Sequence, residues 1–396
     1  MNIAQIDLVY TGTSSNLQKP SILNNKIIVC GFSNYLAKCD NDCNNLSPLN
    51  VPGPTGYWNL LTRTDTNVLY VLSTNALSNN SKVYKSTNSG NSWTLKLDTA
   101  NYDVFIPAFF DSLEGIVCGS YGKLLRTKNG GNSWTSGTHS FFLPSLTHVY
   151  SDSIIIMAGQ ASNALSYFQI SKNRGNTWPL FSKFPGNGTI MGFDFLNKDT
   201  ILGISKNGDI SHEIGFSFNG GVNWTYHLLP IETVPNGLSV KSRKEIYVVG
   251  QSTGNKGIIL KSTDFGSTWL YYESEINETF MGIVFLNDSI ALISGTNGFL
   301  AKWNYKRAVF TGLAEQAPQV LQLGAYPNPV TNELFLNYDR AKINVTRITI
   351  TDLLGRTVYQ SAGPVDKIST AFLPPGLYQL KAETDKGQKT LRLVKE

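Results

Sequence analysis

The chain has 396 residues, of which 41% are hydrophobic, 11% aromatic and 15% charged, and its formal net charge is +5. This composition excludes a disordered chain, and because no run of about 18 apolar residues occurs we predict no membrane span. The five arginines before residue 308 are scattered, so we predict no basic stripe and no nucleic-acid partner. The 35 glycines, with frequent Asn, Ser and Thr, favour short strands joined by tight turns.

All four cysteines lie within the first 118 residues of the chain. Cys30 and Cys118 each lie in an apolar V-C-G run, where a small buried core residue is expected. Cys39 and Cys43 lie four residues apart in the polar turn K-C-D-N-D-C-N-N, where an oxidising compartment would permit a local disulfide. No second cysteine pair or nearby histidine completes a zinc site.

The same turn begins like a calcium-binding loop, with Asp40, Asp42 and Asn44 at alternate positions. Asn45 stands where such a loop needs glycine, and Val51 stands where it needs glutamate. We therefore predict no metal site in this turn.

An eight-residue motif, called the repeat motif below, occurs five times. The copies STNSGNSW, TKNGGNSW, SKNRGNTW, SFNGGVNW and STDFGSTW end at Trp93, Trp134, Trp178, Trp224 and Trp269. Successive tryptophans are 41, 44, 46 and 45 residues apart, a period typical of β-propellers. Three predicted strands precede each copy, and the same order appears without a complete motif at residues 20–46 and 283–303. The sequence therefore predicts an all-β, seven-bladed β-propeller.

Turn chemistry explains the residue types of the repeat motif. The third side chain can accept hydrogen bonds from nearby backbone N–H groups, the fifth residue is glycine because the turn needs a positive φ, and the tryptophan packs between blades. We therefore assign the third residues to turn structure and not to catalysis: Asn88, Asn129, Asn173, Asn219 and Asp264.

The repeat motif resembles the Asp-box, or BNR, repeat over residues 20–303. That resemblance implies a structural turn on the face away from the ligand. Asp-box propellers include sialidases, xyloglucan-cleaving hydrolases, sortilin-type receptors and Ycf48-like photosystem assembly factors, so the resemblance predicts a fold and not an activity. Residues 6–12 precede the first repeat and have no partner of their own, so we expect them to supply the outer strand of the seventh blade and close the ring.

The repeat ends before residue 306. We predict a propeller over residues 1–305, a linker over 306–320 and a second domain over 321–396. Alternating apolar and polar residues between Gly, Pro and Asn turns predict that the second domain is a small immunoglobulin-like β-sandwich.

This C-terminal segment resembles the type A sorting domain of the type IX, or Por, secretion system of the Bacteroidetes phylum. The resemblance rests on Y-P-N-P, D-L-L-G-R, P-G-L-Y-Q-L-K and the terminal L-R-L-V-K. The residues expected to carry the sorting signal are Tyr326, Pro327, Asn328, Pro329, Gly355, Arg356, Gly376, Tyr378, Lys381 and Lys395. A binding module of immunoglobulin type is the alternative.

The resemblance implies passage through the periplasm, recognition by the outer-membrane translocon and its shuttle, and secretion or attachment to the cell surface. The opening residues, MNIAQIDLVYTG, lack the charged and apolar regions of a signal peptide. We therefore expect the numbering to begin at a mature or engineered end, with a cytoplasmic start as the alternative.

Catalytic motifs are weak in the propeller region. A glycoside hydrolase needs two carboxylates roughly 5 to 10 Å apart, and Asp103, Asp194 and Asp209 are the candidates, although each also suits a turn. By family resemblance, a sialidase would need an arginine triad and an F-R-I-P-type motif. The F-R-I-P-type motif is absent, and the propeller region has five scattered arginines. The four histidines, His139, His148, His212 and His227, show no metal-binding spacing. We predict no catalytic residue, metal or cofactor.

A binding role remains, on the face built from loops between blades and between second and third strands. The expected ligand-binding residues are Tyr121, His139, Phe141, Phe142, His212, Tyr271 and Tyr272. Exposed aromatic rings beside Asn, Ser and His suit a glycan or a protein ligand, although Phe141 and Phe142 equally suit a strand core. We therefore expect a secreted or cell-surface binding protein similar in architecture to Ycf48-like propellers, with a polysaccharide-acting glycoside hydrolase as the alternative.

Overall fold

The computed structural model divides the chain into two compact units, Met1–Ala317 and Pro318–Glu396. It describes residues 6–396 except positions 24–25, 34, 41, 53–56, 64–66, 76–79, 100–103, 164, 185–187, 208–210, 231–232, 243–244, 309, 311, 314–322, 339–342, 353–354, 366 and 385–386. The described part contains strands and no helix.

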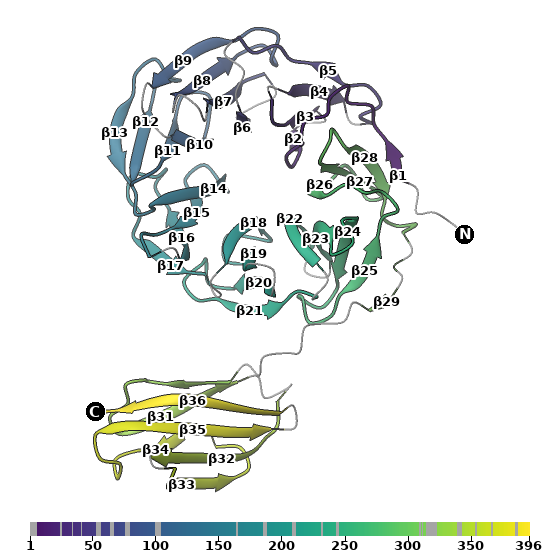
Figure 1. Cartoon of the computed structure of the whole chain (residues 1–396). Coiled ribbons are helices and arrows are strands. Elements are labelled where there is room, and N and C mark those ends of the chain that lie inside the picture. The colour runs from purple at the N-terminus through teal and green to yellow at the C-terminus, as the bar shows by residue number, and fades with distance from the viewer. Residues whose placement is uncertain are drawn as a thin grey trace. The chain divides into compact units, whose positions relative to one another are not determined.

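The first unit is a ring of seven antiparallel sheets, so the predicted all-β, seven-bladed propeller is confirmed (Figure 1). Blades one to four contain β2 (Ser21–Leu23), β3 (Lys26–Cys30), β4 (Leu36–Asp40) and β5 (Ser47–Pro48); β6 (Tyr57–Arg63), β7 (Leu69–Asn75), β8 (Asn80–Ser86) and β9 (Thr94–Thr99); β10 (Val104–Phe109), β11 (Gly115–Gly119), β12 (Lys123–Thr127) and β13 (Thr135–Thr138); and β14 (Leu143–Val149), β15 (Ile155–Gln160), β16 (Ser166–Ser171) and β17 (Leu180–Lys183).

The strands of the other three blades follow the same order. They are β18 (Thr189–Phe195), β19 (Ile201–Asn207), β20 (Ser211–Ser217) and β21 (Thr225–Leu228) in blade five; β22 (Thr233–Ser242), β23 (Glu245–Ser252), β24 (Gly257–Ser262), β25 (Leu270–Glu273) and β29 (Gly312–Leu313) in blade six; and β26 (Phe280–Phe285), β27 (Ile290–Gly295), β28 (Leu300–Asn304) and β1 (Ile6–Leu8) in blade seven.

The first strand of each blade lies nearest the centre of the ring (Figure 1). The second strands are almost continuously apolar, and every residue of β11 is buried. Because each blade is covered on both faces by its neighbours, such a strand shows no alternation of apolar and polar residues.

The tryptophans that end the repeat motifs pack between blades. Trp134 lies in a cluster with Tyr70 and Phe109, and its indole N–H donates to the carbonyl of Lys96 at 2.9 Å. Trp269 is fully buried between blades five and six. Each such ring removes a large apolar surface from water at a blade interface, and this burial stabilises the contact between neighbouring blades.

Hydrogen bonds within each repeat motif close the turn. In the first copy the Ser86 hydroxyl accepts from the N–H of Gly90 at 2.8 Å, and Asn88 Oδ1 accepts from the N–H of Ser92 at 2.9 Å. The third residue is Asp264 in the fifth copy, where Oδ1 accepts from the Thr268 N–H at 2.8 Å and Oδ2 accepts from the Thr268 hydroxyl at 2.7 Å. Asparagine achieves the same closure by donating from Nδ2 to the hydroxyl.

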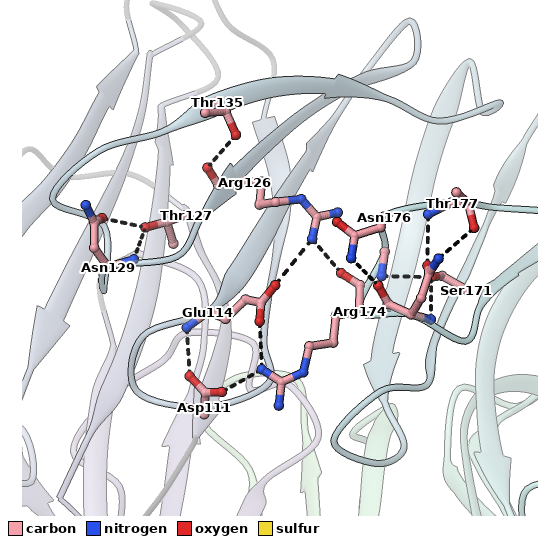
Figure 2. Close-up of polar contacts among 12 residues, drawn as sticks. Asp111, Glu114, Arg126, Thr127, Asn129, Thr135, Ser171, Arg174, Asn176 and Thr177 are labelled. Carbon is pink, nitrogen blue, oxygen red and sulfur yellow. Dashed lines mark hydrogen bonds and ion pairs between the residues drawn. The ribbon is translucent and has the colours of Figure 1, made fainter.

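An ion cluster joins the repeat motif of blade four to the β10–β11 turn of blade three (Figure 2). Arg174 Nη1 lies 2.8 Å from Asp111 Oδ2 and 2.7 Å from Glu114 Oε2. Arg126 Nη1 donates to the carbonyl of Arg174 at 2.8 Å and lies 3.6 Å from Glu114 Oε1. Both carboxylates are thus paired inside the cluster, so it connects blades.

The N-terminal strand closes the ring. β1 runs antiparallel to β28 with Ile6 opposite Trp303 and Leu8 opposite Ala301. The pairing continues beyond the strand, because the N–H of Val9 donates to the carbonyl of Leu300 at 2.8 Å. Blade seven therefore receives its fourth strand from the opposite end of the propeller sequence.

The chain returns to blade six after β28. In β29, Gly312 and Leu313 pair with Tyr271 and Leu270 at the outer edge of the blade. Phe310 packs against Trp303 with ring centroids 6.3 Å apart. The segment expected to be a linker, residues 306–320, therefore begins with residues that pack on the propeller, because Phe310 is apolar and β25 offers an unpaired edge.

The second unit is a two-sheet sandwich. One sheet contains β30 (Leu323–Tyr326), β31 (Glu333–Tyr338) and β34 (Lys367–Ser369); the other contains β33 (Thr357–Ala362), β32 (Val345–Asp352), β35 (Gly376–Thr384) and β36 (Gly387–Lys395). Apolar side chains from both sheets pack into one core that includes Leu334, Ile350 and Leu380.

Deleting residues 1–12 should lower the melting temperature of the propeller by about 5 °C or more, because blade seven loses the β1–β28 ladder and its edge opens. Differential scanning calorimetry measures this change. Deleting only residues 1–5, which precede β1, is the matched control and should leave the melting temperature unchanged. Equal melting temperatures for both deletions would contradict the role of β1.

The variant Asp264→Asn should be nearly as stable as the wild type, because its amide can donate to Thr268 as Asn173 donates to Thr177 at 2.9 Å. Asp264→Ala should cost about 1 kcal/mol or more, since it leaves three hydrogen-bonding groups of the turn without a partner. Urea denaturation followed by tryptophan fluorescence separates the two variants. A loss of stability in Asp264→Asn equal to that in Asp264→Ala would show that the charge, and not the hydrogen bonds, closes this turn.

Candidate functional site

A cavity of about 560 Å³ lies where the innermost strands of the propeller meet. Its wall includes residues of β10, β14, β18, β22 and β26, with residues 18–21 beside blade one. The wall is therefore assembled from segments spread over most of the propeller sequence.

Four innermost strands, β14, β18, β22 and β26, each contain a β-bulge near their start. Register breaks lie between Pro144 and Leu146, between Ile190 and Gly192, between Pro235 and Gly237, and between Phe280 and Gly282. The residues inside these breaks, Ser145, Met191, Asn236 and Met281, all line the cavity. A bulge adds one residue to a strand and re-aims its side chain, so the bulges determine which side chains face the cavity.

Glycine follows the bulge in blades five, six and seven. A Cβ atom on Gly282 would lie 2.4 Å from the Cα of Lys19, and one on Gly237 would lie 2.8 Å from the carbonyl oxygen of Met281. Only glycine permits this approach of neighbouring innermost strands. The close contact at Gly282 places Lys19 at the cavity wall.

The charged groups of the cavity are Lys19 and Asp194. Lys19 Nζ donates to the carbonyl of Leu238 at 2.8 Å and lies 3.8 Å from Asp194 Oδ2. Asp194 accepts backbone N–H groups on both oxygens, from Phe195 at 2.8 Å and from Val240 at 2.9 Å. The carboxylate is therefore held rigidly, and it is the single carboxylate among the described residues of the wall.

His148 also lines the cavity, where its ring stacks on Phe195 with centroids 5.1 Å apart. The residue is exposed by its surface area, and the surrounding protein atoms desolvate its ring in part. This desolvation lowers the pKa of His148, whereas Asp194 raises it and Lys19 lowers it, and the net shift is downward.

Four of the predicted ligand-binding residues meet between blades three and four. Tyr121 lies in the β11–β12 turn with a φ of 58°, and its N–H donates to the carbonyl of Phe142 at 2.9 Å. The two rings are perpendicular, with centroids 4.7 Å apart, and Tyr121 is 66% exposed and Phe142 39% exposed. We call this pair the Tyr121–Phe142 platform.

His139 and Phe141 lie beneath the platform and are buried. His139 Nε2 lies 2.9 Å from the carbonyl of Gly119, and Nδ1 accepts from the N–H of Phe141 at 3.1 Å. This pattern requires the neutral tautomer with the proton on Nε2. Burial lowers the pKa of His139, which keeps that tautomer at neutral pH. His139 is therefore buried and not exposed as predicted, and Phe141 occupies the core position that was its alternative.

The other three predicted residues lie elsewhere. His212 is buried in β20 of blade five. Tyr271 and Tyr272 lie on β25, where the Tyr271 hydroxyl donates to Glu273 Oε2 at 2.7 Å and Tyr272 packs near Trp303 with ring centroids 6.2 Å apart. Both tyrosines are half-buried strand residues and do not lie in a loop as predicted, and β29 pairs with the same strand at Tyr271.

Two of the three candidate hydrolase carboxylates, Asp103 and Asp209, lie outside the described residues, and Asp194 is the cavity carboxylate described above. Cys39 and Cys43 form a disulfide with a Cα–Cα distance of 5.1 Å, and Cys30 and Cys118 are free and buried. Within the described part of the chain, no group of three His, Cys, Asp or Glu side chains is arranged to hold a metal ion.

The expected sorting residues are structural parts of the sandwich. Asn328 follows Pro327 and precedes Pro329, and both X-Pro bonds, Tyr326–Pro327 and Asn328–Pro329, are cis. Asn328 donates from Nδ2 to the carbonyl of Arg392 and accepts the N–H of Val394 on Oδ1, both at 2.8 Å. This asparagine thereby fastens the last strand, β36, to the start of the domain.

The remaining sorting residues lie at turns and on strands. Gly355 has a φ of 79° in the turn where Arg356 Nε lies 2.7 Å from Asp352 Oδ2. The Tyr378 hydroxyl donates to the carbonyl of Pro374 at 2.9 Å. Gly376 and Lys381 lie on β35, and Lys395, which is nearly buried, ends β36.

Comparison with known families identifies the C-terminal unit. Residues 324–396 match the secretion system C-terminal sorting domain, which confirms the resemblance found in the sequence. The domain indicates export to the cell surface or secretion, and it implies interaction with the type IX secretion machinery. No curated protein matches this sequence. The described residues contain no helix that could cross a membrane.

Solved structures share the propeller fold. Those similar to this chain include YCF48 bound to D1 peptide (15% identity, TM-score 0.58, covering 76% of this chain and 96% of that chain), YCF48 from Cyanidioschyzon merolae (13%, 0.58, 76% and 99%) and streptogramin B lyase (12%, 0.60, 76% and 96%). At these identities the similarity shows the fold alone.

His139 should make the stability of the protein depend on pH. Folding lowers its pKa below the ordinary value of 6.5, so the unfolded chain binds the proton more readily and stability falls as the pH drops below about 6.5. The melting temperature of the wild type should therefore fall more between pH 7.5 and pH 5.5 than that of His139→Gln. His148 is present in both proteins, so the difference reports His139, and identical pH profiles would contradict the assignment.

Proposed function

We propose that this protein is an exported, non-catalytic binding protein that recognises a glycan through the Tyr121–Phe142 platform. The backbone conformation of Tyr121 carries this proposal. Bulky side chains rarely adopt the left-handed conformation, and their cost there is about 1 kcal/mol or more. In blade seven the equivalent turn has Asn297 with a φ of 50°, and asparagine tolerates this conformation well.

Few contacts within the protein compensate for the strained conformation of Tyr121. Its ring contacts Phe142 but stays 66% exposed, whereas an asparagine would close the same turn without an apolar surface in water. Strained residues with exposed aromatic rings are typical of binding sites. We therefore assign the ring of Tyr121 to contact with a ligand.

The surroundings of the platform favour a glycan. The backbone N–H groups of Tyr121 and Gly122 donate to the carbonyls of Phe142 and Phe141, so the turn offers rings and no free strand edge to which a peptide could add. The apolar face of a sugar ring packs on an aromatic face. Gln160, whose carbonyl accepts the N–H of Phe142 at 2.8 Å, adds a polar side chain near the rings, and its Nε2 donates to Thr189 at 3.3 Å, which leaves Oε1 as an acceptor for a sugar hydroxyl.

A peptide ligand and glycoside hydrolysis are the alternatives to glycan binding. YCF48 bound to D1 peptide is a propeller of similar fold that binds a peptide, which makes a peptide the competing ligand for this chain. Glycoside hydrolysis is less well supported, because the described cavity wall contains one carboxylate and the reaction needs two.

The export route is the second part of the proposal. Residues 321–396 would bring the protein to the type IX translocon and its outer-membrane shuttle, and the binding unit would then act on the cell surface or in the medium. An exterior location agrees with the disulfide of Cys39 and Cys43, since disulfides persist outside the cytoplasm.

The variant Tyr121→Asn tests the platform. It should bind glycans at least tenfold more weakly than the wild type on a glycan and polysaccharide array, because it removes the exposed ring. Its melting temperature should equal or exceed that of the wild type, since asparagine relieves the strained turn. Tyr121→Phe should retain binding.

The control for this experiment is Tyr10→Asn, which removes a tyrosine that is 90% exposed beside β1 and should leave binding unchanged. A peptide array run in parallel compares the two ligand classes. Binding of peptides and not glycans, or glycan binding that survives Tyr121→Asn, would contradict the proposal, and released sugars would favour the hydrolase.

A further inference from the structure

The central cavity is lined by residues other than those of the Tyr121–Phe142 platform, so the inference below is independent of the proposed glycan site. Its volume of about 560 Å³ lies within the range of small-molecule sites, roughly 300 to 1,000 Å³. Met191, Met281 and Leu146 form apolar parts of the wall. Thioether side chains adapt their shape to an apolar group, so this part of the cavity suits an apolar ligand side chain.

Lys19 and Asp194 retain hydrogen-bonding capacity towards the cavity. An ammonium group has three N–H donors, and the described partner of Lys19 Nζ within hydrogen-bond distance is the carbonyl of Leu238 at 2.8 Å. Each oxygen of Asp194 accepts one backbone N–H and keeps a further lone pair. Both groups line the cavity, so a ligand there can reach both.

The two charges are separated by 3.8 Å and cancel each other over longer distances. A ligand with a single charge is attracted by one group and repelled by the other, which leaves little net electrostatic gain. A ligand with both charges on neighbouring groups is complementary to the pair. An α-amino acid has this arrangement, since its ammonium and carboxylate are attached to the same carbon atom.

We infer that the central cavity binds a free α-amino acid with a large apolar side chain. The ligand's carboxylate accepts hydrogen bonds from Lys19, its ammonium donates to Asp194, and its side chain lies among Met191, Met281 and Leu146. The bulges and the glycine at position 282 preorganise the site, because they position these groups before any ligand arrives.

Isothermal titration calorimetry with the full chain tests this inference. L-phenylalanine and L-leucine are the probes, and N-acetyl-L-phenylalanine and L-phenylalaninamide are the matched compounds that each lack one charge. We expect at least one of the two amino acids to bind, and each blocked derivative of phenylalanine to bind at least tenfold more weakly than phenylalanine. Lys19→Met and Asp194→Asn should each weaken binding of the amino acid at least tenfold.

Lys82→Met is the control variant, since it breaks the Lys82–Asp98 pair at 2.9 Å on blade two and should leave binding unchanged. The comparison of blocked and unblocked ligands uses the wild type alone, so it stays decisive if a cavity variant fails to fold. The inference is overturned if neither amino acid binds at millimolar concentration, if the blocked compounds bind equally well, or if folded Lys19→Met and Asp194→Asn bind normally.

Discussion

The antiparallel pairing of β1 with β28 is the interaction on which the propeller depends. Without β1, blade seven would end at β28 with an open edge, and the ends of the ring would be joined only by isolated backbone hydrogen bonds such as that from the Leu17 N–H to the Gly295 carbonyl among the described residues. Closure sets the circumference and therefore how closely the innermost strands approach. The glycine at position 282, which admits no Cβ atom beside Lys19, is a consequence of that approach, and the cavity is what remains at the centre.

Three bulky residues, Tyr121, Arg174 and Phe265, have a left-handed φ, and the first two differ in how the strain is offset. Arg174, at φ 58°, uses its side chain for two ion pairs to blade three, so the contacts of the ion cluster compensate for its conformation. Tyr121 has the same φ but makes one aromatic contact and stays mostly exposed. The two residues lie in turns between different strands. The side chain of Arg174 is used in ion pairs, whereas the ring of Tyr121 is free to contact a ligand, so we assign the ligand contact to Tyr121.

Parts of the candidate sites were predictable. The position of Tyr121 and Phe142 in loops indicated exposed rings, but the burial of His139 and Phe141 beneath them depends on contacts with Gly119 and blade four. Lys19 lies in a segment without a sequence motif, so no pattern in the sequence predicted that it lines the cavity. A signal for the bulges did exist, since Met191, Asn236 and Met281 each precede a glycine at the same place in their repeats.

The sequence by itself determined the number of blades, the order of strands, the turn at each repeat motif and the sorting domain. These features are local, because a side chain such as Asn88 closes its turn with groups at most four residues away. Tertiary structure alone decided which side chains face the cavity and the pairing of Lys19 with Asp194. That pairing joins blades one and five, so it exists only when the whole ring has closed.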